Sequence, residues 1–348
     1  MVKQHYNYTI SLVRVLACAL IVWNHLSNFM LNGFLNRWNW ANIGVQVFFF
    51  MSGYLYGGRI IHDRKAWLIK QTKKIVKPYY LYLLLIIPVI CFIDINSLNI
   101  LNISSAFLCI QGFSLYQIDG LGQHWFVSYI LFCYLLFSVF SNTSFVSRYN
   151  KIGGGKYWLI FLCCTILFQI MTIPLAMLIK FKISYILTFV IGCCYKERFV
   201  TAAHEHEKNI WDLFIFLMAI LGFVVRIFIE NSELSGIWGN IADMTTQYIK
   251  MIWACAIFVL FNKILPDRIW ENVGSNIKGF LVYLSGITYE IYLVHEFFVH
   301  DSYISIFGEF SIMVKVFIAL LSIVVTTWIL CGLESIADRL SIIKKATV

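Results

Sequence analysis

The sequence predicts an all-α membrane protein that crosses the bilayer many times. Of its 348 residues, 60% are hydrophobic and only 13% are charged, and the mean hydropathy is +0.77. Soluble globular domains carry about twice that fraction of charged residues, so a soluble fold is excluded. Apolar runs long enough to cross an approximately 30 Å hydrocarbon core recur along nearly the whole chain.

About ten of these runs are predicted to be transmembrane helices, and the sixth is the shortest. They cover residues 10–30, 42–58, 78–93, 121–140, 157–178, 183–195, 211–229, 247–265, 280–299 and 312–333.

Basic residues predict how these helices are oriented. If the N-terminus is cytoplasmic, 20 of the 27 lysines and arginines fall in segments on the cytoplasmic side. This asymmetry follows the positive-inside rule and places both termini in the cytoplasm. The net charge of +9 is therefore a topology signal, with membrane lipids as its counterpart, and it requires no nucleic-acid partner.

Nothing along the chain suggests a second domain. Residues 1–348 are predicted to form a single membrane domain with no fused soluble domain, and the N-terminal segment lacks the pattern of a removable signal peptide. We expect a multi-pass protein of the cell membrane, the inner or plasma membrane. The ten cysteines lie almost entirely within predicted spans and are interpreted as packing residues, and no metal site is predicted.

Arg14 and His25 are the most informative residues of the first apolar run. Ionisable side chains are costly inside a membrane and commonly have a function there. Eleven residues make about three helical turns, so the two side chains project from nearly the same face of a helix. His25 can accept a proton near neutral pH, as a general base acting on a hydroxyl group must. The alternatives are a hydrogen bond from His25 to another helix and an Arg14 that reaches the headgroups.

The ninth predicted span carries two further ionisable residues, Glu290 and His295. An unpaired Glu290 carboxylate near the middle of that span would be costly, so we expect it to be protonated or paired, with Arg226 as a candidate partner. His295 is expected in the same outer layer as His25. A structural hydrogen bond is the alternative for His295.

Several motifs recur in a characteristic order. Arg14 and His25 are followed by Gly44–Tyr54, by the basic segment that ends Lys73-Lys74-Ile75-Val76-Lys77-Pro78, by His124-Trp125-Phe126-Val127-Ser128 and by Ile287–His295. This series resembles the acyltransferase type 3 family of integral-membrane acyltransferases, over essentially the whole chain. Lys74 and Lys77 stand where the family usually has two arginines, and Gln46 stands where many members have an acid. These departures point to the branch of simple polysaccharide O-acyltransferases.

The resemblance implies a membrane-bound O-acyltransferase. It would move an acyl group, most often acetyl, from cytoplasmic acyl-CoA to a hydroxyl of a cell-surface or lipid-linked glycan. His25 would be the catalytic residue and Arg14 its partner toward the donor, while Lys74 and Lys77 would bind CoA phosphates. Direct transfer with His25 as the base and a route through a covalent acyl-His25 are both open at this stage. His124, Ser128 and His295 are candidates for orienting substrate, and Trp125 and Glu290 complete the predicted substrate-binding set.

Other functions remain open at this stage. The basic segment Arg59–Lys77 is also explained as a topology anchor, and Trp125 also suits an aromatic belt at the membrane interface. A transporter or flippase for a lipid-linked glycan or small solute has similar composition, although no inverted repeat was found. A non-catalytic partner of a polysaccharide synthase is a third alternative.

Overall fold

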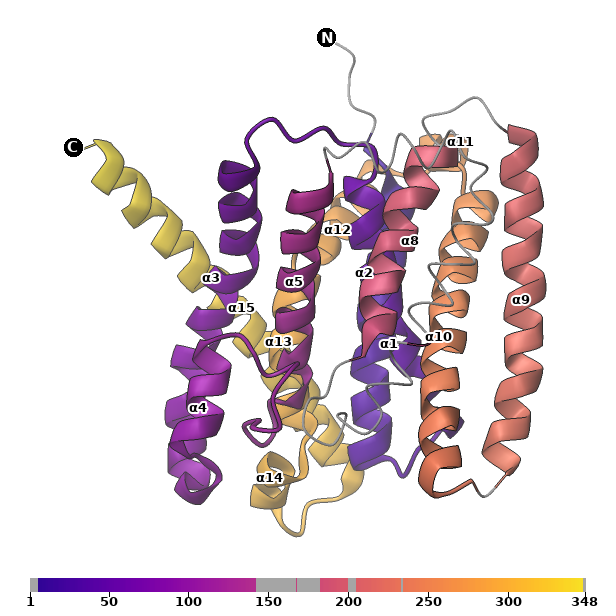
Figure 1. The fold of residues 1–348 in the computed structure, drawn as a ribbon. Coiled ribbons are helices and arrows are strands. Elements are labelled where there is room, and N and C mark those ends of the chain that lie inside the picture. Colours follow the sequence, from indigo (N-terminus) through magenta and orange to yellow (C-terminus); the bar gives the residue numbers. More distant parts are fainter. Residues whose placement is uncertain (1–5, 142–166, 168–181, 200–204, 233, 347–348) are drawn as a thin grey trace. The chain divides into compact units, whose positions relative to one another are not determined.

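The computed structural model describes residues 6–141, 167, 182–199, 205–232 and 234–346. In this part of the chain every regular element is a helix and no strand occurs (Figure 1). The prediction of an all-α protein is therefore confirmed.

The chain divides into two compact units whose segments alternate along the sequence. The first unit comprises residues 1–17, 42–65 and 135–282, and the second comprises residues 18–41, 66–134 and 283–348. Helix α1 (Tyr8–Met30) begins where the Asn7 side chain accepts a hydrogen bond from the backbone N–H of Ile10 (2.9 Å), and it contributes to both units. That the whole chain is a single acyltransferase domain stays a prediction.

The first unit is built around the contact between α2 and α8. Besides its share of α1, it contains α2 (Ile43–Tyr56), α8 (Ile183–Phe199), α9 (Glu205–Asn231), α10 (Gly236–Ile264) and α11 (Asp267–Glu271). Helix α10 packs against α2, α8 and α9, and a short connection joins α9 to α10 (Figure 1).

Glycines bring α2 and α8 into backbone contact. A Cβ atom on Gly53 would lie 1.9 Å from the carbonyl oxygen of Phe189, and one on Gly57 would lie 2.3 Å from that of Cys193. Their four-residue spacing is the small-residue motif that lets membrane helices approach closely. The Thr188 hydroxyl adds a 2.5 Å hydrogen bond to Gln46. The small residues of this span therefore serve helix packing.

The second unit contains the remaining long helices and the short elements between them. These are η1 (Arg37–Asn42), α3 (Arg64–Ile93), η2 (Ile95–Ser97), α4 (Ile100–Phe107), η3 (Gly122–His124), α5 (Trp125–Phe140), α13 (Thr288–Val299), α14 (Asp301–Ile304), η4 (Ser305–Phe307) and α15 (Ile312–Ala346). Helices α3 and α5 each extend past a unit boundary, as does α12 (Ser275–Gly286). Buried side chains of α3, α13 and α15 share one apolar core, which holds α13 in place.

Six helices in the described ranges are long and apolar enough to cross a membrane, and a seventh span results if α12 and α13, bent by 59°, are taken together. Helix α2, with 14 residues, is shorter than the predicted span 42–58, whereas α8, with 17 residues, extends beyond the predicted span 183–195. A helix of 14 residues is only about 21 Å long. Apart from residue 167, the predicted span 157–178 lies outside the described residues. About ten spans and cytoplasmic termini therefore stay predictions.

Candidate active site

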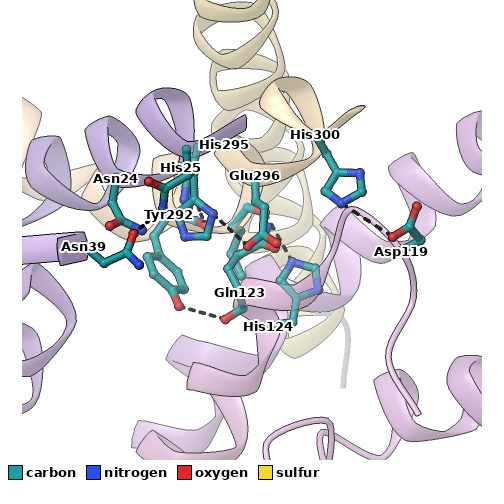
Figure 2. Close-up of polar contacts among 12 residues, drawn as sticks. Asn24, His25, Asn39, Asp119, Gln123, His124, Tyr292, His295, Glu296 and His300 are labelled. Atoms are coloured by element: carbon teal, nitrogen blue, oxygen red, sulfur yellow. Dashed lines mark hydrogen bonds and ion pairs between the residues drawn. The ribbon is translucent and has the colours of Figure 1, made fainter. Parts of the chain in front are cut away.

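His25 lies at the centre of a buried polar cluster in the second unit. Its Nδ1 atom lies 3.5 Å from Oε2 of Glu296 (Figure 2). The His25 side chain is 21% exposed. The ring of His295 stands edge-on to the His25 ring, with 5.0 Å between ring centroids. Contact of Nδ1 with a carboxylate orients the imidazole and leaves Nε2 as the nitrogen available to a substrate.

Glu296 is held against His25 by the short helix η3. A Cβ atom on Gly122 would lie 2.8 Å from Oε1 of Glu296, so only glycine leaves the carboxylate this space. The backbone amides of Gly122 and Gln123 interact with the same carboxylate. Glu296 itself is only 6% exposed. The carboxylate therefore has one well-defined position.

Several hydrogen bonds connect η3 to α13. The Tyr292 hydroxyl donates to the backbone carbonyl of Gln123 (2.8 Å), and Gln123 Nε2 donates to the backbone carbonyl of Leu293 (2.8 Å). Nε2 of His124 lies 3.2 Å from the same Leu293 oxygen. Nδ1 of His295 lies 2.8 Å from the carbonyl oxygen of Tyr292. Both faces of the cluster are thus positioned by rigid helices, as a preorganised site requires.

Buried polar atoms without a hydrogen-bond partner accumulate in this cluster. Among the described residues they include Oε1 of Gln123, Nδ1 of His124, Nε2 of His295 and Oε2 of Glu296, which meets only the His25 ring. Buried polar groups are normally satisfied, and the exceptions call for an explanation such as catalysis or an absent ligand. No group of three or more potential metal ligands is found in the described ranges.

A second ionisable pair lies at the edge of the cluster. Nε2 of His300 lies 3.5 Å from Oδ1 of Asp119 (Figure 2). The Ser302 hydroxyl donates a hydrogen bond to the other carboxylate oxygen of Asp119. The ring of Phe29 lies between the two histidines, 5.9 Å from the His25 ring and 4.9 Å from the His300 ring. This pair is satisfied within itself and fixes the chain at the end of α13.

Of the predicted substrate-binding residues, the structure brings His295 into the cluster with His25, while Trp125 and Ser128 begin the neighbouring helix α5. The Ser128 hydroxyl accepts a 2.9 Å hydrogen bond from the backbone N–H of Gly112, and the Trp125 ring packs against Tyr129. The sequence thus places these two residues next to η3, and Ser128 links α5 to the segment at Gly112. Arg14 is half-buried and belongs to the first unit, so its partnership with His25 stays a prediction.

Lys74 and Lys77 differ in their surroundings. Both lie on α3, which begins at Arg64, so most of the basic segment is helical. Lys77 donates to the backbone carbonyl of Glu334 (2.8 Å) and pairs with Asp338 (2.6 Å), both on α15. Lys74 is exposed. The structure therefore gives Lys77 a packing role and leaves Lys74 accessible to an anionic ligand.

The structure distinguishes the two glutamates of the ninth predicted span. Glu290 is half-buried, and its Oε2 atom has no hydrogen-bond partner among the described residues. Arg226, its candidate partner, instead pairs with Glu230 and donates to the Thr246 hydroxyl. Glu296, which sequence reasoning missed, is the carboxylate that meets His25. An acid directly after His295 in an apolar run was the available signal.

Comparison with known proteins gives one match. Residues 7–332, nearly the whole chain, match a family model described as an acyltransferase domain. No curated protein matches the chain, and no solved structure matches it.

Proposed function

This chain belongs to the acyltransferase type 3 family, and on that premise we propose that it is a membrane O-acyltransferase that uses acyl-CoA, with acetyl-CoA as the expected donor. The expected acceptor is a hydroxyl group of a cell-surface or lipid-linked glycan. One observation carries the proposal: the contact of His25 Nδ1 with the buried Glu296 carboxylate. An imidazole oriented by a carboxylate is a recurrent arrangement for activating a hydroxyl group.

The proposed reaction needs His25 as the base. Nε2 of His25 takes the proton of the acceptor hydroxyl, and the oxygen attacks the thioester carbonyl carbon. The tetrahedral intermediate collapses as the carbon–sulfur bond breaks, and the CoA sulfur receives the proton back from His25. Glu296 stabilises the imidazolium that forms between the two proton transfers. Protons balance, so the reaction needs no other acid or base.

The donor is proposed to approach along α3. CoA carries several phosphate charges, which attract lysine and arginine side chains. Lys74 is exposed and therefore accessible to such a phosphate, whereas Lys77 is already paired with Asp338. Lysine offers a point charge and lacks the two parallel donors of arginine, so each contact is expected to be modest.

Membranes that contain the full chain and its natural glycans, incubated with radiolabelled acetyl-CoA, provide the test. We expect His25→Gln to reduce label transfer to the glycan fraction by about 10²- to 10⁴-fold, because glutamine retains a hydrogen-bond donor toward Glu296 and cannot act as a base. The thermal unfolding midpoint of the purified variant should stay at the native value. Added imidazole should partly restore transfer in His25→Ala.

Undiminished transfer in His25→Gln would remove His25 from the mechanism. If the native protein transferred no acyl group while its loss prevented a glycan from crossing the membrane, the transporter function would take the place of this proposal.

A further inference from the structure

Four asparagine side chains form a continuous hydrogen-bonded chain at the end of α1. Asn36 Nδ2 donates to Oδ1 of Asn24 (3.0 Å) and to Oδ1 of Asn28 (3.0 Å), and Asn28 Nδ2 donates to Oδ1 of Asn39 (2.7 Å). Oδ1 of Asn36 accepts from the backbone N–H of Ala41 (3.1 Å). We name this set, Asn24, Asn28, Asn36 and Asn39, the asparagine chain.

The asparagine chain leads from beside His25 to the protein surface. Asn24 precedes His25 in α1, and Asn28 follows it by three residues, which places Asn28 and His25 on neighbouring positions of the helix surface, with about 5–6 Å between Cβ atoms. Asn24 and Asn36 are 5% and 2% exposed, whereas Asn28 and Asn39 are exposed. Figure 2 shows Asn24 and Asn39 in the same close-up as His25 and Glu296.

The loop that presents this chain has a strained backbone. Among the described residues, four that are not glycine have positive φ, and three of them lie in this loop: Asn32 (50°), Leu35 (51°) and Asn39 (52°). Such conformations cost free energy and persist only where the surrounding contacts impose them. The hydrogen bond from Asn28 holds the Asn39 side chain, so the position of the Asn39 amide is set by the fold.

The exposed end of the chain retains unused hydrogen-bonding capacity. Each asparagine amide has two N–H donors and one carbonyl acceptor. Asn39 uses its oxygen, and no acceptor for its nitrogen is found in the described part of the chain. Uncharged amides match sugar hydroxyls, which both donate and accept, whereas a phosphate or carboxylate would call for cations. The nearby Trp40 ring is 42% exposed and is anchored by a hydrogen bond from its Nε1 to the carbonyl of Leu35 (2.8 Å).

We propose that Asn28 and Asn39 bind hydroxyl groups of the acceptor glycan and thereby present a neighbouring hydroxyl to His25. This inference rests on the proposed acyltransferase function and assigns residues to its acceptor. Asn24 and Asn36 are positioning residues, because they fix the two exposed amides from behind.

The loop itself offers a matched control for the test. Asn39→Gly removes the amide at a left-handed position, where glycine is readily accommodated, and Asn32→Gly does the same at an exposed asparagine outside the asparagine chain. In the same membranes, Asn39→Gly should raise the KM for the glycan about tenfold, as expected for one or two lost hydrogen bonds. Its affinity for acetyl-CoA should stay at the native value, and Asn32→Gly should behave like the native protein.

Asn39→Asp separates ligand binding from loop structure. Aspartate retains the oxygen that accepts from Asn28 but lacks the N–H donors, so this variant should also lose glycan affinity while it keeps acetyl-CoA binding. Native glycan KM values in both Asn39 variants would overturn the inference, and so would an equal loss of acetyl-CoA binding and glycan affinity. Absence of any His25-dependent transfer from acetyl-CoA in the native protein would instead contradict the proposed function itself.

Discussion

Two buried charged residues of the first unit, Asp212 and Arg226, are paired, whereas the second unit leaves buried polar atoms of the His25 cluster without hydrogen-bond partners among the described residues. In the first unit, Asp212 is fully buried, accepts a hydrogen bond from the Tyr195 hydroxyl (2.8 Å) and pairs with Lys263 (3.0 Å). Arg226 pairs with Glu230 one helical turn away. In the second unit, by contrast, Nε2 of His295 and Nδ1 of His124 have no partner among the described residues.

This difference separates polar groups that stabilise the fold from polar groups arranged for chemistry. A paired buried charge has its electrostatic cost offset at its own site, so it can be explained by structure alone. Unsatisfied atoms cost free energy, and they are tolerated where function requires them. We therefore expect variants of the His25 cluster to change acyl transfer and variants of the paired Asp212 to change stability. The following predictions test this contrast, beginning with the largest effect on transfer.

Loss of the Glu296 carboxylate should have the largest effect after loss of His25 itself. Glu296→Gln keeps the size of the side chain and removes the charge that stabilises protonated His25. We expect kcat to fall about 100-fold with the KM for acetyl-CoA unchanged, because partners that orient a functional imidazole commonly contribute about 10- to 100-fold. Steady-state kinetics on the purified protein measures kcat and the KM for acetyl-CoA separately. A raised KM with native kcat would show that Glu296 binds donor instead.

The same contact can be disturbed without changing either partner. In Gly122→Ala, the new Cβ would lie 2.8 Å from Oε1 of Glu296 and should displace the carboxylate from His25. We expect kcat to fall about tenfold, since small displacements in a catalytic arrangement are costly. Gly332→Ala is the matched control, because a Cβ at Gly332 meets nothing within 4 Å. Equal activity of the two variants would argue against a positioned carboxylate.

Substitution of Lys74 and of Lys77, both on α3, should have different effects on acetyl-CoA binding. Lys74→Ala should raise the KM for acetyl-CoA about threefold, the scale of one exposed charge pair. Lys73→Ala removes the same charge from an adjacent exposed position and should have a smaller effect. Lys77→Ala should mainly lower the unfolding midpoint, because it removes the link to α15. If Lys73 and Lys74 prove equivalent, the segment acts as a general positive field.

In the first unit, substitution of Asp212 should lower stability without reducing acyl transfer. Asp212→Ala should leave transfer per folded molecule unchanged and lower the free energy of unfolding by about 2 kcal/mol, because Tyr195 and Lys263 lose their partner. Thermal unfolding of the protein in detergent measures this effect. Asp212→Asn, which keeps an acceptor for Tyr195, should lie between the native protein and Asp212→Ala. If an Asp212 variant lost acyl transfer while it kept native stability, the proposed difference between the two units would be wrong.

The sequence by itself determined the class of the protein, its all-helical character and the approximate position of the long described helices. Hydropathy is a local property, and a run such as residues 10–30 must form a helix in a membrane because its backbone groups have no other partners. It also singled out His25 and His295, because ionisable residues are conspicuous in apolar runs. The match over residues 7–332 confirms the family that the ordered motifs suggested.

Only the tertiary structure decided which polar groups meet. Glu290 and Glu296 lie six residues apart in one apolar run, and the packing of α13 against η3 and α15 brings Glu296 to His25. The 59° bend between α12 and α13, the pairing of Lys77 with α15 and the asparagine chain likewise depend on contacts between distant segments. Hydropathy reports the cost of burying a residue but carries no information on the direction in which its side chain points, and that direction is set by packing.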